Sequence, residues 1–471
     1  MDQGNSKNGS HLPESGNTLI IVLIIMFGQG SWIALNGLWV ELPVLVSLGI
    51  PEGFNIATWL VLIIQLANVG PLLFTIINYL TPSQFHLELQ TNYIITALGA
   101  VVTFLLIFLW DEYSVWKLTG KTHSTALLIC AFVLSIVDCT SSVAFTPFMS
   151  RFKSVYVTWY FIGEGFSALT PSIFALVQGV ASNTECIANQ TFIYENDTHE
   201  IRCYSWVSRQ KAPRFGPGIY FTFLFAMAAA CFTSFLLLNI LPLSRREQQV
   251  TDSTNQGKAN DSYQYEMVAD GDIKQTKSNI GTPVPKKPIR FYLSVFTILG
   301  IVNALSNSVL PSVQSFSAGG YGLKTYLVAA TLACVSKPLA AFFVLVKPMN
   351  KLLFVGGVAL VGISVGSYCM LTAFMSPSPP MQQTVTGRGL IVCAWVVSSG
   401  CFAYVHANIG WILRREPDNR SLLIWFGVIT QVGSLIGACV MFVVLTFTTA
   451  LVPYYEDPCK DQVSCDITNL I

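Results

Sequence analysis

Residues 18–46 of the chain read TLIIVLIIMFGQGSWIALNGLWVELPVLV, and this stretch decides the class of fold. Glu41 is its only charged side chain. A helix needs about 20 mostly apolar residues to cross a bilayer, so the stretch is long enough to do so. The polar residues 1–17 before it contain no small-residue cleavage site. We therefore expect a membrane span that stays in the mature protein, rather than a cleaved signal peptide.

The composition of the whole chain indicates a membrane protein. Charged residues make up 11% of the 471 residues, against about 25% in soluble globular domains. Hydrophobic residues reach 52%, and the mean hydropathy is +0.56. The formal net charge is +1, so the protein lacks the strong positive potential that attracts nucleic acid or an acidic partner. The lipid bilayer is therefore the partner that the composition predicts, and no nucleic acid is expected.

Ten further apolar runs follow the first. Together they predict an all-α polytopic membrane protein with eleven transmembrane helices, at residues 18–46, 54–80, 91–110, 124–148, 155–180, 217–242, 289–313, 322–346, 351–375, 388–413 and 421–450. Gly28, Gly30 and the Glu41-Leu42-Pro43 step interrupt the first run, Gly70-Pro71 the second and Pro338 the eighth. We expect a helix break at each, satisfied by protein or water.

A polar stretch divides the runs into six and five. Residues 243–288 lack a long apolar run and indicate a flexible cytoplasmic linker. This layout is typical of transporters whose two helical bundles rock around a site near the midplane. The predicted division is a cytoplasmic N-terminus at 1–17, a six-helix bundle at 18–242 with an extracellular loop at 181–216, the linker at 243–288, a five-helix bundle at 289–450 and an extracellular tail at 451–471.

The loops predict the orientation of the chain. With the N-terminus inside, the cytoplasmic segments hold sixteen Lys and Arg residues and the outer segments nine, which follows the positive-inside rule. N-glycosylation sequons begin at Asn189 and Asn196, and such sites are modified only on the lumenal side. We therefore place the N-terminus in the cytoplasm and the C-terminus outside. Four cysteines in the outer segments suit disulfide bonds of open connectivity, namely Cys186, Cys203, Cys459 and Cys465.

Four ionisable side chains lie well inside the predicted spans, where a charge is costly, and a fifth, Glu41, lies toward the outer end of the first span. The functional interpretation of such groups is proton coupling or contact with a substrate. The structural interpretation is a pair that locks two helices together or, for a lysine, a side chain that reaches toward the interface. The candidates for proton coupling are Glu41, Asp138, Glu164, Lys337 and His406.

Uncharged polar groups and indoles are dense in the same spans. Asn303, Asn307 and Gln314 share one helical face, as expected for a stripe that lines a cavity. Trp32 lies near mid-span and could stack on a planar ligand, whereas Trp39 could be an interfacial anchor. Single Ser and Thr residues could instead bond a neighbouring helix. The candidate substrate-binding residues are Ser31, Trp32, Asn36, Trp39, Gln65, Asn68, Thr140, Ser142, Asn303, Asn307 and Gln314.

The sequence contains no signature of catalysis or of a metal site. It has no Walker loop, no His-Glu-x-x-His and no CxxC pair. We therefore expect a protein that is not an enzyme, with no metal and no cofactor, driven by a gradient or by facilitated diffusion.

Several blocks of sequence resemble the animal riboflavin transporters, solute carrier family 52. In the first half these are Gly30-Ser31-Trp32, residues 36–43 (NGLWVELP), residues 65–71 (QLANVGP), residues 138–143 (DCTSSV), residues 147–151 (PFMSR) and Gly163-Glu164-Gly165. In the second half they are Asn303-Ala304-Leu305, residues 310–314 (LPSVQ), residues 431–435 (QVGSL) and the paired tail cysteines. The blocks at 138–143 and 163–165 look most like the third paralogue, the intestinal-type uptake carrier.

The resemblance implies both a function and an arrangement. It implies riboflavin (vitamin B2) uptake at the plasma membrane without sodium, stimulated by acid in the third paralogue. It also implies a fold similar to the equilibrative nucleoside transporters and the major facilitator fold, with the first, fourth, seventh and tenth spans lining the path. Lys337 departs from the family pattern, which has an uncharged residue there, and complicates a simple proton-coupling scheme.

Riboflavin's chemistry agrees with the polar stripe. Its flat ring needs an aromatic face, its uracil-like edge needs amides, and its ribityl chain needs hydroxyls and amides. The residues alone also allow a facilitative carrier for another flat polar solute, such as a nucleoside, or a non-transporting receptor or scaffold. We expect alternating access by a monomer.

Overall fold

The computed structural model describes residues 17–80, 87–117, 120–149, 151–179, 184–196, 199–210, 213–248, 287–414, 416, 419–453 and 463–469. The helices are α1 Thr18–Gln29, α2 Ile33–Ser47, α3 Ile56–Leu66, α4 Val69–Leu80, α5 Leu87–Leu109, α6 Thr125–Met149, α7 Ser154–Gln178, α8 Pro217–Ile240, α9 Pro242–Glu247, α10 Ile289–Ala304, α11 Leu310–Gly319, α12 Leu323–Val346, α13 Leu352–Phe374, α14 Val385–Arg414 and α15 Asn419–Phe447. A 3₁₀ turn, η1, covers Gly53–Asn55, and a π-helical turn at Leu305–Val309 joins α10 to α11.

The predicted number of spans is confirmed. Ten helical segments of the described chain are long and apolar enough to cross a membrane, and α1 with α2 forms an eleventh, bent by 54°. All eleven overlap the predicted runs. The predicted class, an all-α polytopic protein with spans divided six and five, is therefore confirmed as well.

Two of the predicted helix breaks are wrong and one is displaced. The chain breaks at Gly30–Trp32 as expected, but Pro43 lies inside α2 and Pro338 inside α12. A proline removes only one backbone donor, and both helices continue past it. The second span breaks at Ala67–Asn68, so that Pro71 falls in the first turn of α4, where backbone N–H groups have no intrahelical partner anyway.

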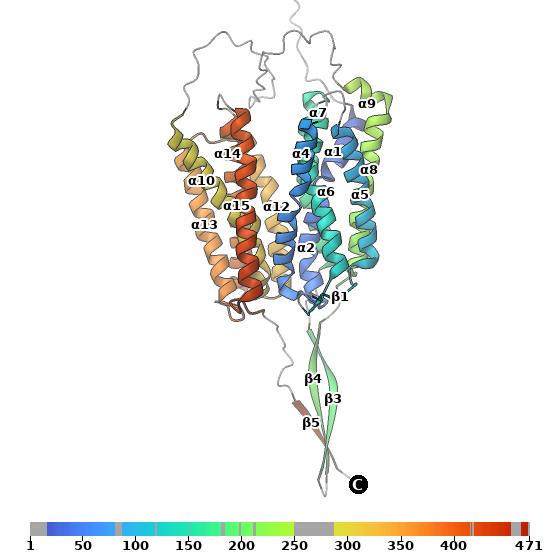
Figure 1. Cartoon of the computed structure of the whole chain (residues 1–471). Coiled ribbons are helices and arrows are strands. Elements are labelled where there is room, and N and C mark those ends of the chain that lie inside the picture. The colour runs from blue at the N-terminus through green and yellow to red at the C-terminus, as the bar shows by residue number, and fades with distance from the viewer. Residues whose placement is uncertain are drawn as a thin grey trace, which may run out of the picture.

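The helices form two groups that stand side by side (Figure 1). Helices α1–α9 form the first group and α10–α15 the second, with α2 and α12 in contact where the groups meet. We call the end that carries α9 the linker end, and the end from which strands β3 and β4 project the hairpin end (Figure 1).

The strands lie at the hairpin end. β1 (Ser114–Val115) pairs with β2 (Thr122–His123), and β3 (Thr184–Asn196) pairs with β4 (His199–Gln210), both antiparallel. β5 (Val463–Asn469) joins β4 and sets the backbone of Cys465 opposite that of Cys203. The side chains of these two residues and of Cys186, Asn189 and Asn196 lie outside the described part, as does Cys459. Disulfide bonding and glycosylation therefore stay predictions.

Close packing joins α1 to α7 in the first group. A Cβ atom on Gly163 would overlap the carbonyl oxygen of Ile25, and one on Gly28 would overlap that of Tyr160. Beside them, Phe27 stacks on Phe145 with ring centroids 4.2 Å apart. Only residues without a side chain permit this approach, which holds the α1–α2 break against the bundle.

Candidate substrate cavity

A cavity of about 540 Å³ lies between the two groups, within the size range of small-molecule sites. Its walls come from the α1–α2 break, α2, α3, the α3–α4 break, α6, α10, the π-helical turn, α11, α12, α14 and α15. Eight of the candidate substrate-binding residues line it: Trp32, Asn36, Trp39, Gln65, Asn68, Asn303, Asn307 and Gln314. Two of the proton-coupling candidates, Lys337 and His406, line it too.

The three remaining substrate-binding candidates lie in the packing around the cavity. Ser31 is buried, and its carbonyl oxygen accepts a hydrogen bond from Ser141 at 2.8 Å. Ser142 accepts one from the indole nitrogen of Trp32 at 3.2 Å. The hydroxyl of Thr140 faces Gly70 across the α4–α6 contact, where a Cβ on the glycine would overlap it.

Asp138 forms a hydrogen bond with the backbone of the broken first span. Its Oδ2 atom accepts a hydrogen bond from the backbone nitrogen of Leu35, in the first turn of α2, at 2.9 Å. The first N–H groups of a helix have no partner within it, and a carboxylate is favourable near this end. Asp138 therefore caps α2 from the neighbouring helix α6, although it is only 1% exposed.

Glu41 and Glu164 also lie away from the cavity. Glu41 is fully buried, and its Oε1 accepts a hydrogen bond from Nε2 of Gln178 at 2.9 Å, while Oε2 has no partner. Glu164 is half-buried on α7, in the segment that packs against Gly28. Neither carboxylate is paired with a base in the described residues.

Indoles and amides in the cavity wall are fixed by hydrogen bonds. Trp39 donates from its indole nitrogen to Oε1 of Gln314 at 3.0 Å and so joins the two groups. Trp39 thus has a partner inside the protein as well as a place in the cavity wall. Asn36 donates to Ser167 at 3.3 Å, and Asn68 donates to Oε1 of Gln65 at 3.4 Å.

The π-helical turn places Ser306 and Asn307 in the cavity wall. Asn307 Nδ2 donates to Asn303 Oδ1 and to Ser434 Oγ, both at 3.1 Å. Ser308 donates to the carbonyl oxygen of Ser434. π-turns of this kind are frequent at functional sites.

Sequence reasoning placed the tenth span along the path through the family resemblance, but among the residues of this span it named only His406. Trp395, Ser399 and Phe402 line the cavity from α14 together with His406. These positions follow i, i+4, i+7 and i+11, so they share one helical face. The buried Trp395 is oriented by a hydrogen bond to Ser317 at 3.3 Å. These residues could have been found from the sequence by listing the positions that share a helical face with His406.

Contacts between the groups close the cavity toward the hairpin end. Ser315 donates to the carbonyl oxygen of Phe54 at 2.6 Å, and Thr58 donates to that of Ser312 at 3.2 Å. The ring of Phe54 lies 5.9 Å from that of Phe316. We call these five residues the hairpin-end seal. In the other direction the cavity extends past Lys337 and His406 to Ala341 and Ala407, toward the linker end.

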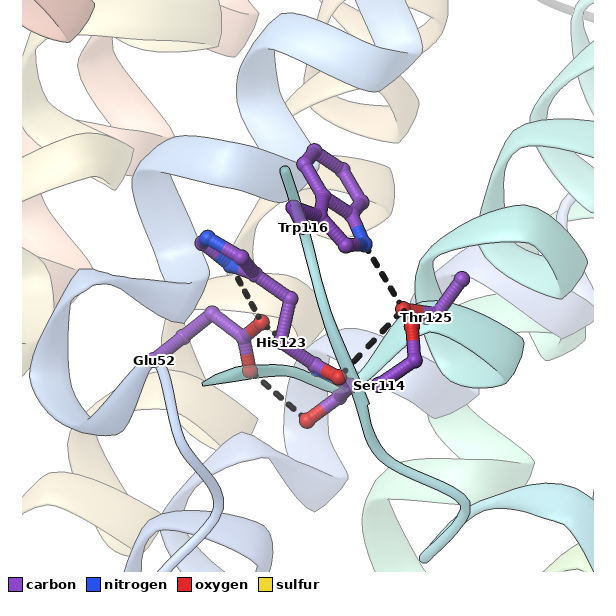
Figure 2. A network of polar contacts seen from close by, with 6 residues as sticks. Glu52, Ser114, Trp116, His123 and Thr125 are labelled. Atoms are coloured by element: carbon purple, nitrogen blue, oxygen red, sulfur yellow. Dashed lines mark hydrogen bonds and ion pairs between the residues drawn. The ribbon is translucent and has the colours of Figure 1, made fainter. Parts of the chain in front are cut away.

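A polar network holds the turn that carries Phe54 (Figure 2). Glu52 accepts hydrogen bonds from the backbone nitrogen of Ser124 at 2.8 Å and from its hydroxyl at 2.7 Å. Nδ1 of His123 lies 3.2 Å from the same carboxylate. Beside it, Trp116 donates to Thr125 at 2.7 Å.

Trp59 connects this network to the second group. Its ring lies 5.4 Å from His123 and 5.1 Å from Phe442 of α15. The network therefore fixes both the seal and a second aromatic contact between the groups.

Residues 16–452 match the sequence model of a protein family, solute carrier family 52, riboflavin transporter. The chain belongs to this family. The riboflavin transporter 2 of Salmo salar is 40% identical over 89% of this chain and 94% of its own length. Member 3-B of Danio rerio is 39% identical over 94% of this chain and 98% of its own. Human member 3 is 36% identical over 90% of this chain and 95% of its own length.

These relatives confirm the resemblance noted from the sequence. Relatives named member 3 reach 39% identity, whereas human member 2 is 34% identical, in agreement with a likeness to the third paralogue. The family is one of solute carriers, and its members are multi-pass membrane proteins.

Solved structures agree with the fold. A bacterial homologue of the human lysosomal transporter Spinster, in an inward-facing and occupied conformation, superposes with a TM-score of 0.51. The match covers 90% of this chain and 80% of that one at 12% identity, so it bears on the fold alone.

Proposed function

We propose that this protein takes up riboflavin across the plasma membrane by alternating access, and that the cavity is its substrate site. The observation that carries the proposal is a cavity between the two groups, lined by amides and by oriented indoles and closed at the hairpin end. Family membership supports riboflavin as the solute. Rocking of the groups would open the hairpin end and close the linker end.

The test is uptake of labelled riboflavin by cells that express the protein at their surface. Trp32→Ala, Asn36→Ala and Asn307→Ala should each lower uptake at equal surface expression. Wild-type uptake in all three variants would contradict the proposed site. Unlabelled riboflavin, and not uridine, should compete; competition by uridine alone would favour a nucleoside carrier.

The energy source is part of the same proposal. Uptake proceeds without sodium and is stimulated by acid, and the candidate groups for binding protons are Glu41, Asp138, Glu164, Lys337 and His406. Replacing sodium with choline should leave uptake unchanged. Glu164→Gln should flatten the dependence of uptake on external pH, and an unchanged profile would remove Glu164 from this role.

The proposal includes an orientation and a state. The linker end faces the cytoplasm, the hairpin end is extracellular, glycosylated and disulfide-bonded, and the protein works as a monomer without a cofactor. Enzymatic removal of N-glycans from intact cells should increase the mobility of the wild type and leave the double variant Asn189→Gln/Asn196→Gln unchanged. Equal mobility before and after treatment would contradict the orientation.

A further inference from the structure

Asn307 offers only its carbonyl oxygen to the cavity. A primary amide has two N–H donors and one acceptor oxygen. Both donors of Asn307 are used inside the protein, on Oδ1 of Asn303 and on Oγ of Ser434. Ser306 donates to Oδ1 at 3.3 Å, which leaves one lone pair of this oxygen for a solute.

A directed chain of hydrogen bonds fixes this orientation. Asn303 donates from Nδ2 to the carbonyl oxygen of Leu299 at 2.8 Å, so its own Oδ1 faces Asn307. Ser434 donates to the carbonyl oxygen of Asn303 at 3.4 Å, so its hydroxyl turns a lone pair toward Asn307. A flipped Asn307 amide would set its oxygen against two acceptors.

The three hydrogen-bonded residues Asn303, Asn307 and Ser434 differ in their access to the cavity. Asn303 and Ser434 are 2% and 1% exposed, whereas Asn307 is exposed and lines the cavity. Asn303 also lines the cavity but is almost wholly buried, so it and Ser434 orient the amide, and Asn307 is the member of the three that is open to a solute.

We propose that Asn307 is a fixed acceptor for an N–H donor on the transported ring, and that Ser434 is the positioning residue that fixes it. This inference rests on the proposed function. The ribityl hydroxyls of riboflavin both donate and accept, so they gain no selectivity from a fixed acceptor. The imide N–H of the ring can only donate, and a site built for such a group rejects an analogue that lacks it.

The test compares riboflavin with riboflavin methylated at the imide nitrogen. Binding to the purified full-length protein in lipid nanodiscs is followed by flavin fluorescence. The wild type should bind the methylated compound about tenfold more weakly. Ser434→Ala frees the Asn307 amide to rotate, and the two affinities should then differ by no more than about twofold.

A matched control separates positioning from a general loss of packing. Ser135 is also a buried helical serine, but it bonds only Ala131 of its own helix. Ser135→Ala should retain the tenfold preference. Asn307→Leu, at an exposed position, removes the acceptor together with the two donors that reach Asn303 and Ser434, and should abolish the preference.

Three results would overturn the inference. Equal binding of the two flavins by the wild type removes the acceptor role of Asn307. Equal weakening of both flavins by Ser434→Ala, with the preference intact, shows that Ser434 is structural only. Failure of the wild type to bind riboflavin at all contradicts the proposed function itself.

Discussion

Asp138 Oδ2 accepts a hydrogen bond from the backbone nitrogen of Leu35 at 2.9 Å, and through it α6 caps α2, the hairpin-end half of the broken first span. The two residues are 103 positions apart in the chain. The cap satisfies a backbone donor that the break at Gly30–Trp32 exposes. Asp138 therefore has a structural role, and its replacement should change the stability of the protein first.

Asp138→Ala should destabilise the protein by about 1–3 kcal/mol, because a buried donor loses its partner. Asp138→Asn keeps an acceptor oxygen and should retain most of the stability and of the uptake. Thermal unfolding of the purified variants measures the first effect, and riboflavin uptake the second. If Asp138→Asn folded normally but lost its dependence on external pH, Asp138 would be a proton carrier and not merely a cap.

The α1–α7 contact predicts an asymmetric response of two neighbouring glycines. Gly163→Ala places a Cβ on the carbonyl oxygen of Ile25 and should cost about 1–3 kcal/mol. Gly165→Ala is the matched control, since its Cβ would lie 3.7 Å from Pro338 in ordinary contact. The melting temperatures of the two variants compare them directly. Equal melting temperatures would mean that α1 and α7 do not pack as described.

The hairpin-end seal predicts a shift in accessibility. Phe54→Ala removes the ring that packs against Phe316 and Gly319, so the hairpin end should open more often. Ser312 is a fully buried member of the seal. Replaced by cysteine, it is a reporter for a membrane-impermeant maleimide applied to intact cells. Labelling should increase several-fold with Phe54→Ala.

Phe104→Ala serves as the control for the seal, because Phe104 is exposed on α5 and far from the second group. It should leave labelling of the reporter unchanged. If the reporter protein were labelled equally with and without Phe54→Ala, contacts other than Phe54 would close this end.

Apolar length and composition predicted the eleven spans, because a helix in lipid must satisfy its own backbone over the whole thickness of the membrane. The same reasoning failed at Pro43 and Pro338, where the rest of the helix compensates for one missing donor. Helical periodicity placed Asn303 and Asn307 on one face, and both line the cavity, although it did not predict the π-helical turn that carries Asn307.

The roles of Asp138 and Ser434 could not be predicted in this way. Ser434 stands within the block 431–435 that resembles the family, yet nothing in that block says which side chain it meets. Both roles depend on a partner from a distant helix, Leu35 for one and Asn307 for the other. Such partners are set by the packing of the bundle and not by local sequence.

Trp395, a residue of the tenth span that sequence reasoning did not name, should contribute to riboflavin binding. Its indole lines the cavity and is oriented by Ser317, which is itself 2.8 Å from the hydroxyl of Thr372. An oriented aromatic face stabilises a stacked flat ring by about 0.5–1.5 kcal/mol beyond the area it buries, so Trp395→Ala should weaken riboflavin binding up to about tenfold. Trp425→Ala is the control, since Trp425 is 54% exposed on α15 and does not line the cavity. Fluorescence titration of both purified variants measures the effect, and equal affinities would exclude Trp395 from the site.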